Sequence, residues 1–404
     1  MSGGGSIAVA MALMNLGTYG YTMIAARLLG PGSYGAFASL MATLLVISVL
    51  QLGLQATAAR RIAAQPDHVA QIERTILGVT YRAAIALGVV LLLLTPLLNR
   101  VLRLDSLVTA ARVSVASIPF TMMGGQAGIL QGERRWQELS VLYVLSGVPR
   151  LLIGSALIAW QPTELSALVG TGIGACLPVV AGWWFLRRGR EPGVPTEEHG
   201  FRHVMVETFH NSHVLLAFFA LSNADIVVAR NVLSEHQAGL YAGGLILTKA
   251  VLFLPQFVVV VAFPSLATAA ERRRALIASL SVVALLGALA TAGAALLPRL
   301  ALVFVGGSSY EELAGHLWVF AILGTILSML QLLVYAVLAR QGQRAVYLVW
   351  TAFVVMVGLG LTTTDFRDLL PVVIGVDAAL LAVLLLLSLR AIPRRVRPPA
   401  ESRV

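Results

Sequence analysis

The sequence predicts an all-α polytopic membrane protein with twelve transmembrane helices. We expect two parallel six-helix bundles, related by a pseudo-twofold axis, around a central cavity. Three observations predict this fold. Of the 404 residues, 58% are hydrophobic and only 12% are charged, whereas soluble proteins have about 25% charged residues. The apolar residues form continuous runs, each close to the 20 or so residues that a helix needs to cross a bilayer. The arginines between these runs gather in alternate connections.

Twelve segments are long and apolar enough to be spans. In chain order they cover residues 6–28, 34–59, 76–98, 107–131, 138–160, 164–186, 205–231, 239–268, 275–297, 311–338, 344–363 and 368–390. The first has no basic residues before it and no evident cleavage site, so we expect a span and not a signal peptide. The fourth, seventh, eighth and tenth are interrupted by polar residues or proline. Because the apolar runs do not alternate with period 2, a transmembrane barrel is excluded.

The basic residues predict the orientation of the chain. The odd-numbered connections hold four arginines, Arg100, Arg103, Arg299 and Arg367. The even-numbered connections and the C-terminal tail hold nineteen: Arg60, Arg61, Arg74, Arg134, Arg135, Arg187, Arg188, Arg190, Arg202, Arg272, Arg273, Arg274, Arg340, Arg344, Arg390, Arg394, Arg395, Arg397 and Arg403. Since basic loops stay in the cytoplasm, we expect both termini there. Topology thereby accounts for most of the net charge of +10, and nucleic-acid binding is not indicated.

The two halves of the chain resemble each other. Ala26 and Arg27 lie near the outer end of span 1 and are followed by Tyr34, while Ala229 and Arg230 of span 7 are followed by Tyr241. An offset of six spans gives both repeats the same orientation, which predicts an axis along the membrane normal and a cavity that opens alternately to each side. The predicted parts are a first bundle at 1–186, a Pro- and Gly-rich cytoplasmic linker at 187–204, a second bundle at 205–391 and a basic tail at 392–404.

Two stretches resemble a known family. They are ARLLGPGSYGAFA at residues 26–38 and NADIVVARNVLSEHQAGLYAGGLILTKAVLFLPQFVVVVAFPSLA at residues 223–267. Both are similar to polysaccharide flippases of the multidrug/oligosaccharidyl-lipid/polysaccharide (MOP) exporter superfamily. The residues that match the family pattern are Asp225, Arg230, Gly239 with Tyr241, Lys249 and Pro264.

The resemblance implies a Wzx-type flippase in the bacterial cytoplasmic (inner) membrane. Such a protein moves an undecaprenyl-pyrophosphate-linked oligosaccharide from the cytoplasmic to the outer leaflet for cell-surface polysaccharide synthesis. Its implied partners are that lipid-linked oligosaccharide, membrane lipids and other biosynthesis proteins such as a polysaccharide polymerase, with H⁺ or Na⁺ as a coupling ion. We expect no enzyme activity, no cofactor and no metal, because the sequence has no metal-ligand cluster, nucleophile–base set or nucleotide motif.

Ionisable residues inside the predicted spans are the candidate site. Each costs about 2.5–3.5 kcal/mol on insertion scales when it lies at the helix centre. There are six cations and two anions: Arg27, Arg82, Arg112, Arg150, Asp225, Arg230, Lys249 and Asp377. The cationic excess suits an anionic substrate, because a guanidinium binds phosphate and carboxylate oxygens in pairs.

We assign these residues by depth. Arg150 and Lys249, near mid-depth, are the main candidates for substrate binding, against an interhelical bond for Arg150 and a structural salt bridge for Lys249. Arg82 and Arg112 are further candidates for substrate binding, as cavity cations that line a vestibule; the alternative is that they extend to the lipid headgroups. Asp225 and Asp377 form an ion pair or couple transport to a cation.

Three further features carry weaker assignments. Arg27 and Arg230 serve an outer gate or extend to headgroups. Pro255 and Pro264 kink span 8. The stretch from Gly170 to Gly174 indicates close helix packing.

Four other functions compete with the flippase. A multidrug and cation antiporter of the same superfamily would need more carboxylates in the cavity. A major-facilitator transporter would carry a basic motif between spans 2 and 3, where this chain reads ATAARRIAAQPDHVAQIER. A glycosyltransferase or polymerase of lipid-linked sugars would have a long outer loop with catalytic acids. A scaffold without transport activity would have the same sequence pattern.

Overall fold

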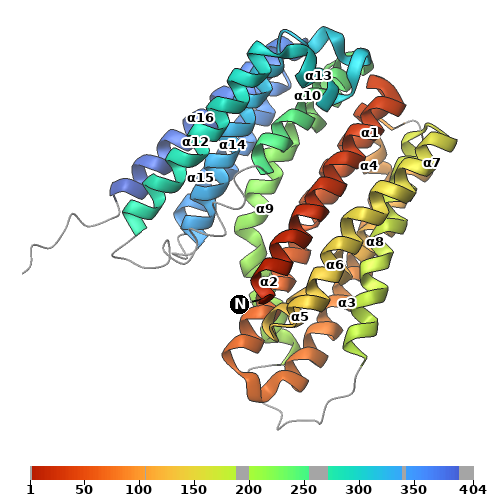
Figure 1. Cartoon of the computed structure of the whole chain (residues 1–404), viewed down its shortest axis with the longest axis vertical. Coiled ribbons are helices and arrows are strands. Elements are labelled where there is room, and N and C mark those ends of the chain that lie inside the picture. The colour runs from red at the N-terminus through yellow and green to blue at the C-terminus, as the bar shows by residue number, and fades with distance from the viewer. Residues whose placement is uncertain (1, 105, 188–199, 254–271, 339–342, 391–404) are drawn as a thin grey trace, which may run out of the picture.

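A computed structural model describes residues 2–104, 106–187, 200–253, 272–338 and 343–390. Over these ranges the chain consists of helices and short connections, without strands. Figure 1 shows two groups of long helices, α1 to α8 and α9 to α16. They lie close together at the end where α1, α10 and α13 meet, and they diverge toward the other end (Figure 1).

The first group is built from residues 2–186. Its helices are α1 (Ser2–Ile47), α2 (Val49–Ala64), α3 (Val69–Leu93), α4 (Thr95–Val101), α5 (Leu107–Gly132), α6 (Trp136–Pro149), α7 (Ser155–Trp160) and α8 (Glu164–Leu186), with a 3₁₀ turn η1 (Pro66–His68) and a π-helical turn η2 (Arg150–Gly154). We call it the N-terminal bundle.

The second group, the C-terminal bundle, repeats this order. Its helices are α9 (Phe201–Val232), α10 (Glu235–Phe253), α12 (Arg272–Leu296), α13 (Pro298–Val305), α14 (Leu317–Leu338), α15 (Gln343–Gly360) and α16 (Phe366–Arg390), with a 3₁₀ segment η4 (Gly307–Leu313). The short helices α4 and α13 follow α3 and α12 at equivalent places, and each begins with a proline in its first turn.

The predicted spans fall on helices. By length and composition, nine helical stretches of the described chain can cross a membrane. The first of these, Gly5–Ala64, holds two of the predicted spans, and the shorter apolar helix Val346–Gly360 lies in the eleventh. The eighth span is seen as α10 and then continues into residues 254–268, outside the described ranges. The chain is therefore an all-α, multi-pass membrane protein, as predicted.

A single glycine separates the first two spans. Gly30 has φ 69° and ψ 173° and is followed by Pro31, so a residue that tolerates positive φ precedes one that cannot continue a helical hydrogen-bond pattern. On a straight helix Tyr21 and Phe37 would be about 24 Å apart. Their ring centroids are instead 5.9 Å apart, which shows that the chain folds back on itself at this glycine.

Helix α9 is shared between the two bundles. Its 32 residues would extend about 48 Å, which exceeds the roughly 30 Å of a bilayer's hydrocarbon core. Near its start, Val204 is fully buried in a hydrophobic cluster of the N-terminal bundle. Three turns into the helix, Ser212 packs directly against Gly53 of α2. The predicted second bundle begins at residue 205, so its first turns pack with the first bundle.

An ion pair fixes this shared segment. Glu207 of α9 bonds to both Arg60 and Arg61 of α2, with Arg61 Nη2 2.7 Å from Glu207 Oε2. The side chain of Glu207 is only 15% exposed and that of Arg61 12%, so the pair is shielded from solvent more than an ordinary surface pair. We call this end of the molecule, where α2 ends and α9 begins, the arginine-rich end.

The glycines of α8 allow close packing, which confirms the prediction for the stretch 170–174. A Cβ on Gly170 would lie 2.4 Å from the Cα of Gly154, and one on Gly174 would lie 2.9 Å from the Cα of Arg150. Gly172, on another side of the helix, has its nearest neighbour at 3.9 Å, the Cβ of Ala116. Two glycines one turn apart therefore bring α8 against the π-helical turn that carries Arg150.

We predict that Gly170→Ala destabilises the protein by about 1–3 kcal/mol, because the added methyl group overpacks a backbone contact. Gly172→Ala on the same helix is the matched control and should be neutral or stabilising by up to about 1 kcal/mol, since alanine favours helix. Thermal unfolding of both variants in detergent, at equal protein concentration, measures the difference. Equal unfolding temperatures for the two variants would refute the packing at this contact.

Candidate functional site

Arg150 is a buried cation inside the N-terminal bundle. It follows Pro149 and opens the π-helical turn Arg150–Gly154, a type of local distortion that often occurs at functional sites. The residue is 8% exposed. Its guanidinium lies 5.1 Å from the ring centroid of Phe120 on α5, and the hydroxyl of Tyr21 on α1 is close enough to act on its charge.

The surroundings of Arg150 leave part of its guanidinium without a partner. Its Nε is buried and has no hydrogen-bond acceptor within the described residues. Tyr21 instead donates its hydroxyl to the carbonyl oxygen of Ala167 at 2.6 Å. A cation–π contact contributes about 0.5–2 kcal/mol, which is less than the cost of the charge within a membrane. The arrangement is therefore suited to accept an anion.

A second cluster lies in the C-terminal bundle. Its members, from α9, α10 and α16, are each 5% exposed or less except for the half-buried Lys249: Ser222, Asn223, Asp225, Tyr241, Lys249 and Asp377. The Nζ of Lys249 donates to the carbonyl oxygen of Ser222 at 2.8 Å and to Oδ1 of Asn223 at 3.1 Å. Tyr241 donates its hydroxyl to Oδ2 of Asp225 at 3.0 Å.

This cluster brings three of the sequence-predicted residues together, with contacts that differ from a simple ion pair. Lys249 interacts electrostatically with both Asp225 and Asp377, yet among the described residues neither carboxylate lies within the 4.0 Å of a direct salt bridge to it. Asp225 is held by Tyr241 and by the backbone N–H of Ile226. Oδ1 of Asp377 is buried and has no described partner.

The two repeat-related arginines make reciprocal contacts between the bundles. Arg230 of α9 donates to the carbonyl oxygens of Leu102 at 3.3 Å and Arg103 at 2.5 Å, just beyond the end of α4. Arg27 of α1 donates to the carbonyl oxygen of Val303 at 3.3 Å, in the last turn of α13. Each cation thereby reaches the C-terminal end of a short helix in the other bundle, where the helix dipole favours positive charge. We call these two contacts the arginine clasp.

Tyr310 reinforces the clasp. Its side chain is fully buried. The ring fits between Gly243 and Gly306, where a Cβ atom added to either glycine would lie 2.4 or 2.5 Å from it. The ring also packs edge-on against Tyr34, with 6.4 Å between the ring centroids. Burial raises the pKa of its hydroxyl, which stays protonated and donates to the carbonyl oxygen of Ala26 at 3.3 Å. Gly35 of α1 also packs on Gly239 of α10. The bundles are thus tightly joined at this end.

The other predicted residues lie elsewhere. Arg82 is exposed and stacks 5.1 Å from the ring of Phe201, at the arginine-rich end. Arg112 is half-buried in the second turn of α5, near the clasp end. Neither contacts Arg150 or Lys249 in the described structure. Pro255 and Pro264 lie outside the described residues.

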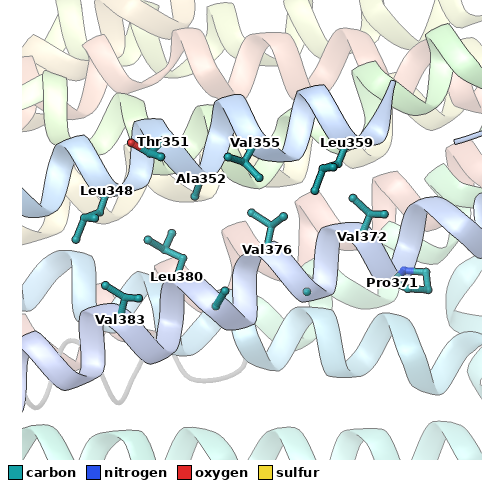
Figure 2. A pocket seen from close by; sticks show the side chains of 12 residues that line it. Leu348, Thr351, Ala352, Val355, Leu359, Pro371, Val372, Val376, Leu380 and Val383 are labelled. Atoms are coloured by element: carbon teal, nitrogen blue, oxygen red, sulfur yellow. The ribbon is translucent and has the colours of Figure 1, made fainter. Parts of the chain in front are cut away.

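A groove of about 450 Å³ lies between α15 and α16. Figure 2 shows its two walls, with Leu348 and Val383 near one end and Leu359 and Pro371 near the other. Thr351 is the one polar side chain among the twelve lining residues. Because no charged residue of either cluster lines it, this groove is separate from the ionisable site.

Sequence reasoning missed several partners. Asn223 and Ser222 were visible beside Asp225 as polar residues in an apolar run, and Tyr241 as part of the repeat. Glu207 carried no signal that would tell a buried ion pair from a solvated charge at a helix entrance. Tyr310 lay in a predicted loop.

The chain matches the family described as polysaccharide biosynthesis protein over residues 1–270. No curated protein sequence matches it significantly. Among solved structures, an inward-facing multidrug resistance MATE family transporter of the MOP superfamily aligns with a TM-score of 0.72 at 16% identity, covering 95% of this chain and 94% of that one.

Two further structures align over similar lengths. The eukaryotic MATE transporter AtDTX14 has a TM-score of 0.63 at 13% identity, covering 96% of this chain and 95% of its own. A MOP superfamily transporter from Pyrococcus furiosus, described as having a binding pocket of reverse polarity that suggests a different function, has a TM-score of 0.64 at 15% identity, covering 96% and 94%. At these identities the matches establish the fold.

We predict that the arginine clasp holds its end of the molecule closed. Gly32 of α1 lies within 3.8 Å of the Glu235 side chain of α10, as measured from an added Cβ. In a Cys176→Ala background, cysteines at these two positions should therefore react quickly with a short bifunctional thiol cross-linker. A hydrogen bond from a charged group contributes about 1.5–3 kcal/mol, so adding Arg230→Met should slow cross-linking about tenfold or more. A protease site placed between residues 187 and 200 makes the linkage visible on a gel.

Arg299→Met provides the control, because that arginine is exposed near the same end and makes no clasp contact. It should leave the cross-linking rate unchanged. The clasp has no gating role if Arg230→Met and Arg27→Met both cross-link as fast as the control.

Proposed function

Since this chain belongs to the polysaccharide biosynthesis protein family, we propose that it is a flippase that moves an undecaprenyl-pyrophosphate-linked oligosaccharide from the cytoplasmic to the outer leaflet. It is a multi-pass membrane transporter with the MOP-superfamily fold and not an enzyme. The observation that carries the proposal is Arg150, a buried guanidinium whose Nε lacks an acceptor in the described structure.

The charge of Arg150 suits the head group of such a substrate. Pyrophosphate oxygens accept two parallel bonds from one guanidinium, and a charge-assisted bond in a dry site is strong. The lipid tail stays in the bilayer, so the transporter has to shield only the polar head. Because Arg150 is only 8% exposed, the proposal requires the surrounding helices of the N-terminal bundle to separate before the head group can reach it.

The closed clasp supports an inward-facing state in this structure. If the arginine-rich end is cytoplasmic, as the positive-inside rule requires, the clasp lies at the outer side and blocks exit there. The overall fit agrees: the TM-score is 0.72 to an inward-facing MATE structure and 0.62 to an outward-facing one. We propose that both termini lie in the cytoplasm, that the membrane is a bacterial inner membrane, as the flippase function implies, and that loading occurs from the cytoplasmic leaflet.

A second candidate is a MATE-like antiporter for drugs or other cations. It is favoured by the two buried carboxylates, Asp225 and Asp377, since organic cations and coupling ions such as H⁺ or Na⁺ bind to carboxylates. The fold accommodates both functions equally. The position of Lys249 beside these carboxylates favours the flippase.

Flipping in proteoliposomes tests the proposal. We expect wild-type protein to move a fluorescent undecaprenyl-pyrophosphate oligosaccharide to the opposite leaflet. Arg150→Ala should lower the initial rate about tenfold or more, because it loses a charge-assisted bond of about 1.5–3 kcal/mol. Arg150→Lys should retain part of the activity, since it keeps the charge but not the paired donors.

Arg367→Ala serves as the matched control, because Arg367 lies at a helix end and stacks on the neighbouring Phe366. It should flip at the wild-type rate. Each variant is first checked for wild-type elution and unfolding temperature in detergent. If several glycans fail with folded wild-type protein while a cationic dye is exported, the antiporter replaces the flippase. Wild-type rates in Arg150→Ala would keep the flippase but remove Arg150 from its site.

A further inference from the structure

We propose that Lys249 is a resident counter-cation, whose ammonium group occupies a site in the C-terminal bundle that would otherwise bind a free monovalent cation. This inference rests on the proposed function and deepens it, because it says that the transporter excludes free cations from this cluster. The contacts of Lys249 do not depend on the identity of the substrate. The inference concerns binding to the protein alone and can be tested without any lipid-linked sugar.

The ammonium of Lys249 is bound by two oxygen atoms of α9. The carbonyl of Ser222 and Oδ1 of Asn223 accept its hydrogen bonds at 2.8 and 3.1 Å. The carboxylates of Asp225 and Asp377 act on its charge from α9 and α16.

An oxygen-rich, negatively charged cluster of this kind is what hard cations such as Na⁺ select. Carbonyl, amide and carboxylate oxygens are all present. With both carboxylates ionised, the pair would carry a charge of −2, which is costly in a membrane without a cation. Lys249 reduces it to −1 and uses the carbonyl and amide oxygens that a free ion would need.

The remaining oxygens form only part of a site. One carboxylate oxygen of Asp225 is bound by Tyr241 and the other by the N–H of Ile226. Oδ1 of Asp377 is buried and without a described hydrogen-bond partner, and its carboxylate interacts electrostatically with Lys249. With Lys249 present, a free cation would find few unoccupied ligands and a positive charge beside them.

The two bundles thus differ in what they accept. In the N-terminal bundle, Arg150 is a cation without a described carboxylate beside it. In the C-terminal bundle, the ammonium of Lys249 is a cation of the protein itself that already interacts electrostatically with the two carboxylates. Lys249 therefore selects against cationic substrates and removes the need for a bound Na⁺ in this cluster.

The test is Na⁺ binding to purified protein in detergent. It is measured with radiolabelled Na⁺ and by the unfolding temperature in sodium chloride against the same concentration of choline chloride, which keeps the ionic strength equal. We expect wild-type protein to bind no Na⁺ and to unfold at the same temperature in both salts. Lys249→Met, of similar length and without charge, should bind Na⁺ and unfold at least about 3 °C higher in sodium chloride, because a ligand that binds the folded state stabilises it.

Two further variants make the result specific. Lys249→Arg retains a cation and should behave as wild type. Lys249→Met combined with Asp377→Asn removes a charged ligand and should lose the Na⁺ response. Na⁺ binding by the wild type would overturn the proposal even if Lys249→Met failed to fold, and so would a folded Lys249→Met that ignores Na⁺. Neither result bears on flipping, so failure of the flippase function would be seen separately.

Discussion

The absence of water in the hydrocarbon core constrains every charged group within the membrane-spanning helices of this fold. A charge or polar atom there must find its partner within the protein. The structure meets this requirement for two cations and not for a third. Arg230 is satisfied by backbone carbonyls at a helix end, and Lys249 by a carbonyl, an amide and two nearby carboxylates. Arg150 is the exception, because its described interactions are with an aromatic face and a phenol, and its buried Nε has no acceptor among the described residues. Arg150 is proposed as the anion site because it lacks the partners that Arg230 and Lys249 have, and not because cations outnumber carboxylates.

The internal repeat has different consequences at different depths. Near the clasp end the repeat is preserved in its contacts. Arg27 and Arg230 each donate to a carbonyl oxygen at the end of a short helix of the other bundle, α13 for Arg27 and α4 for Arg230. At mid-depth the halves have diverged, with a lone cation in one bundle and a mixed cluster in the other. Under the proposed function, the symmetric contacts would serve the gate and the asymmetric interior would serve a substrate with one charged end.

Hydropathy and arginine spacing predicted the spans, since burial in lipid demands long apolar runs whatever the packing. The eight ionisable residues could be found the same way. Their partners could not, because the partner of a residue depends on the rotation of its helix about its own axis, which an apolar sequence leaves almost free. Lys249 therefore bonds to Asn223 and not directly to Asp225, and Arg82 stacks on Phe201. The spacing of these residues in the sequence predicts neither contact. The close packing at Gly170 and Gly174 could be predicted from the sequence, because small residues one turn apart form one face of a helix.

Helix α9 shows why two rigid bundles are an incomplete description. At the arginine-rich end its first turns are part of the N-terminal bundle through Val204, Glu207 and Ser212. At the other end Arg230 joins it to the same bundle. The 18 residues from Ser212 to Arg230 span about 27 Å, and over this stretch α9 carries the Asp225 cluster of the C-terminal bundle. A helix fixed at both ends to one bundle cannot rotate rigidly with the other. Any rocking motion that opens the clasp must therefore either release the first turns of α9 or bend the helix between Ser212 and Asp225, next to the buried charges.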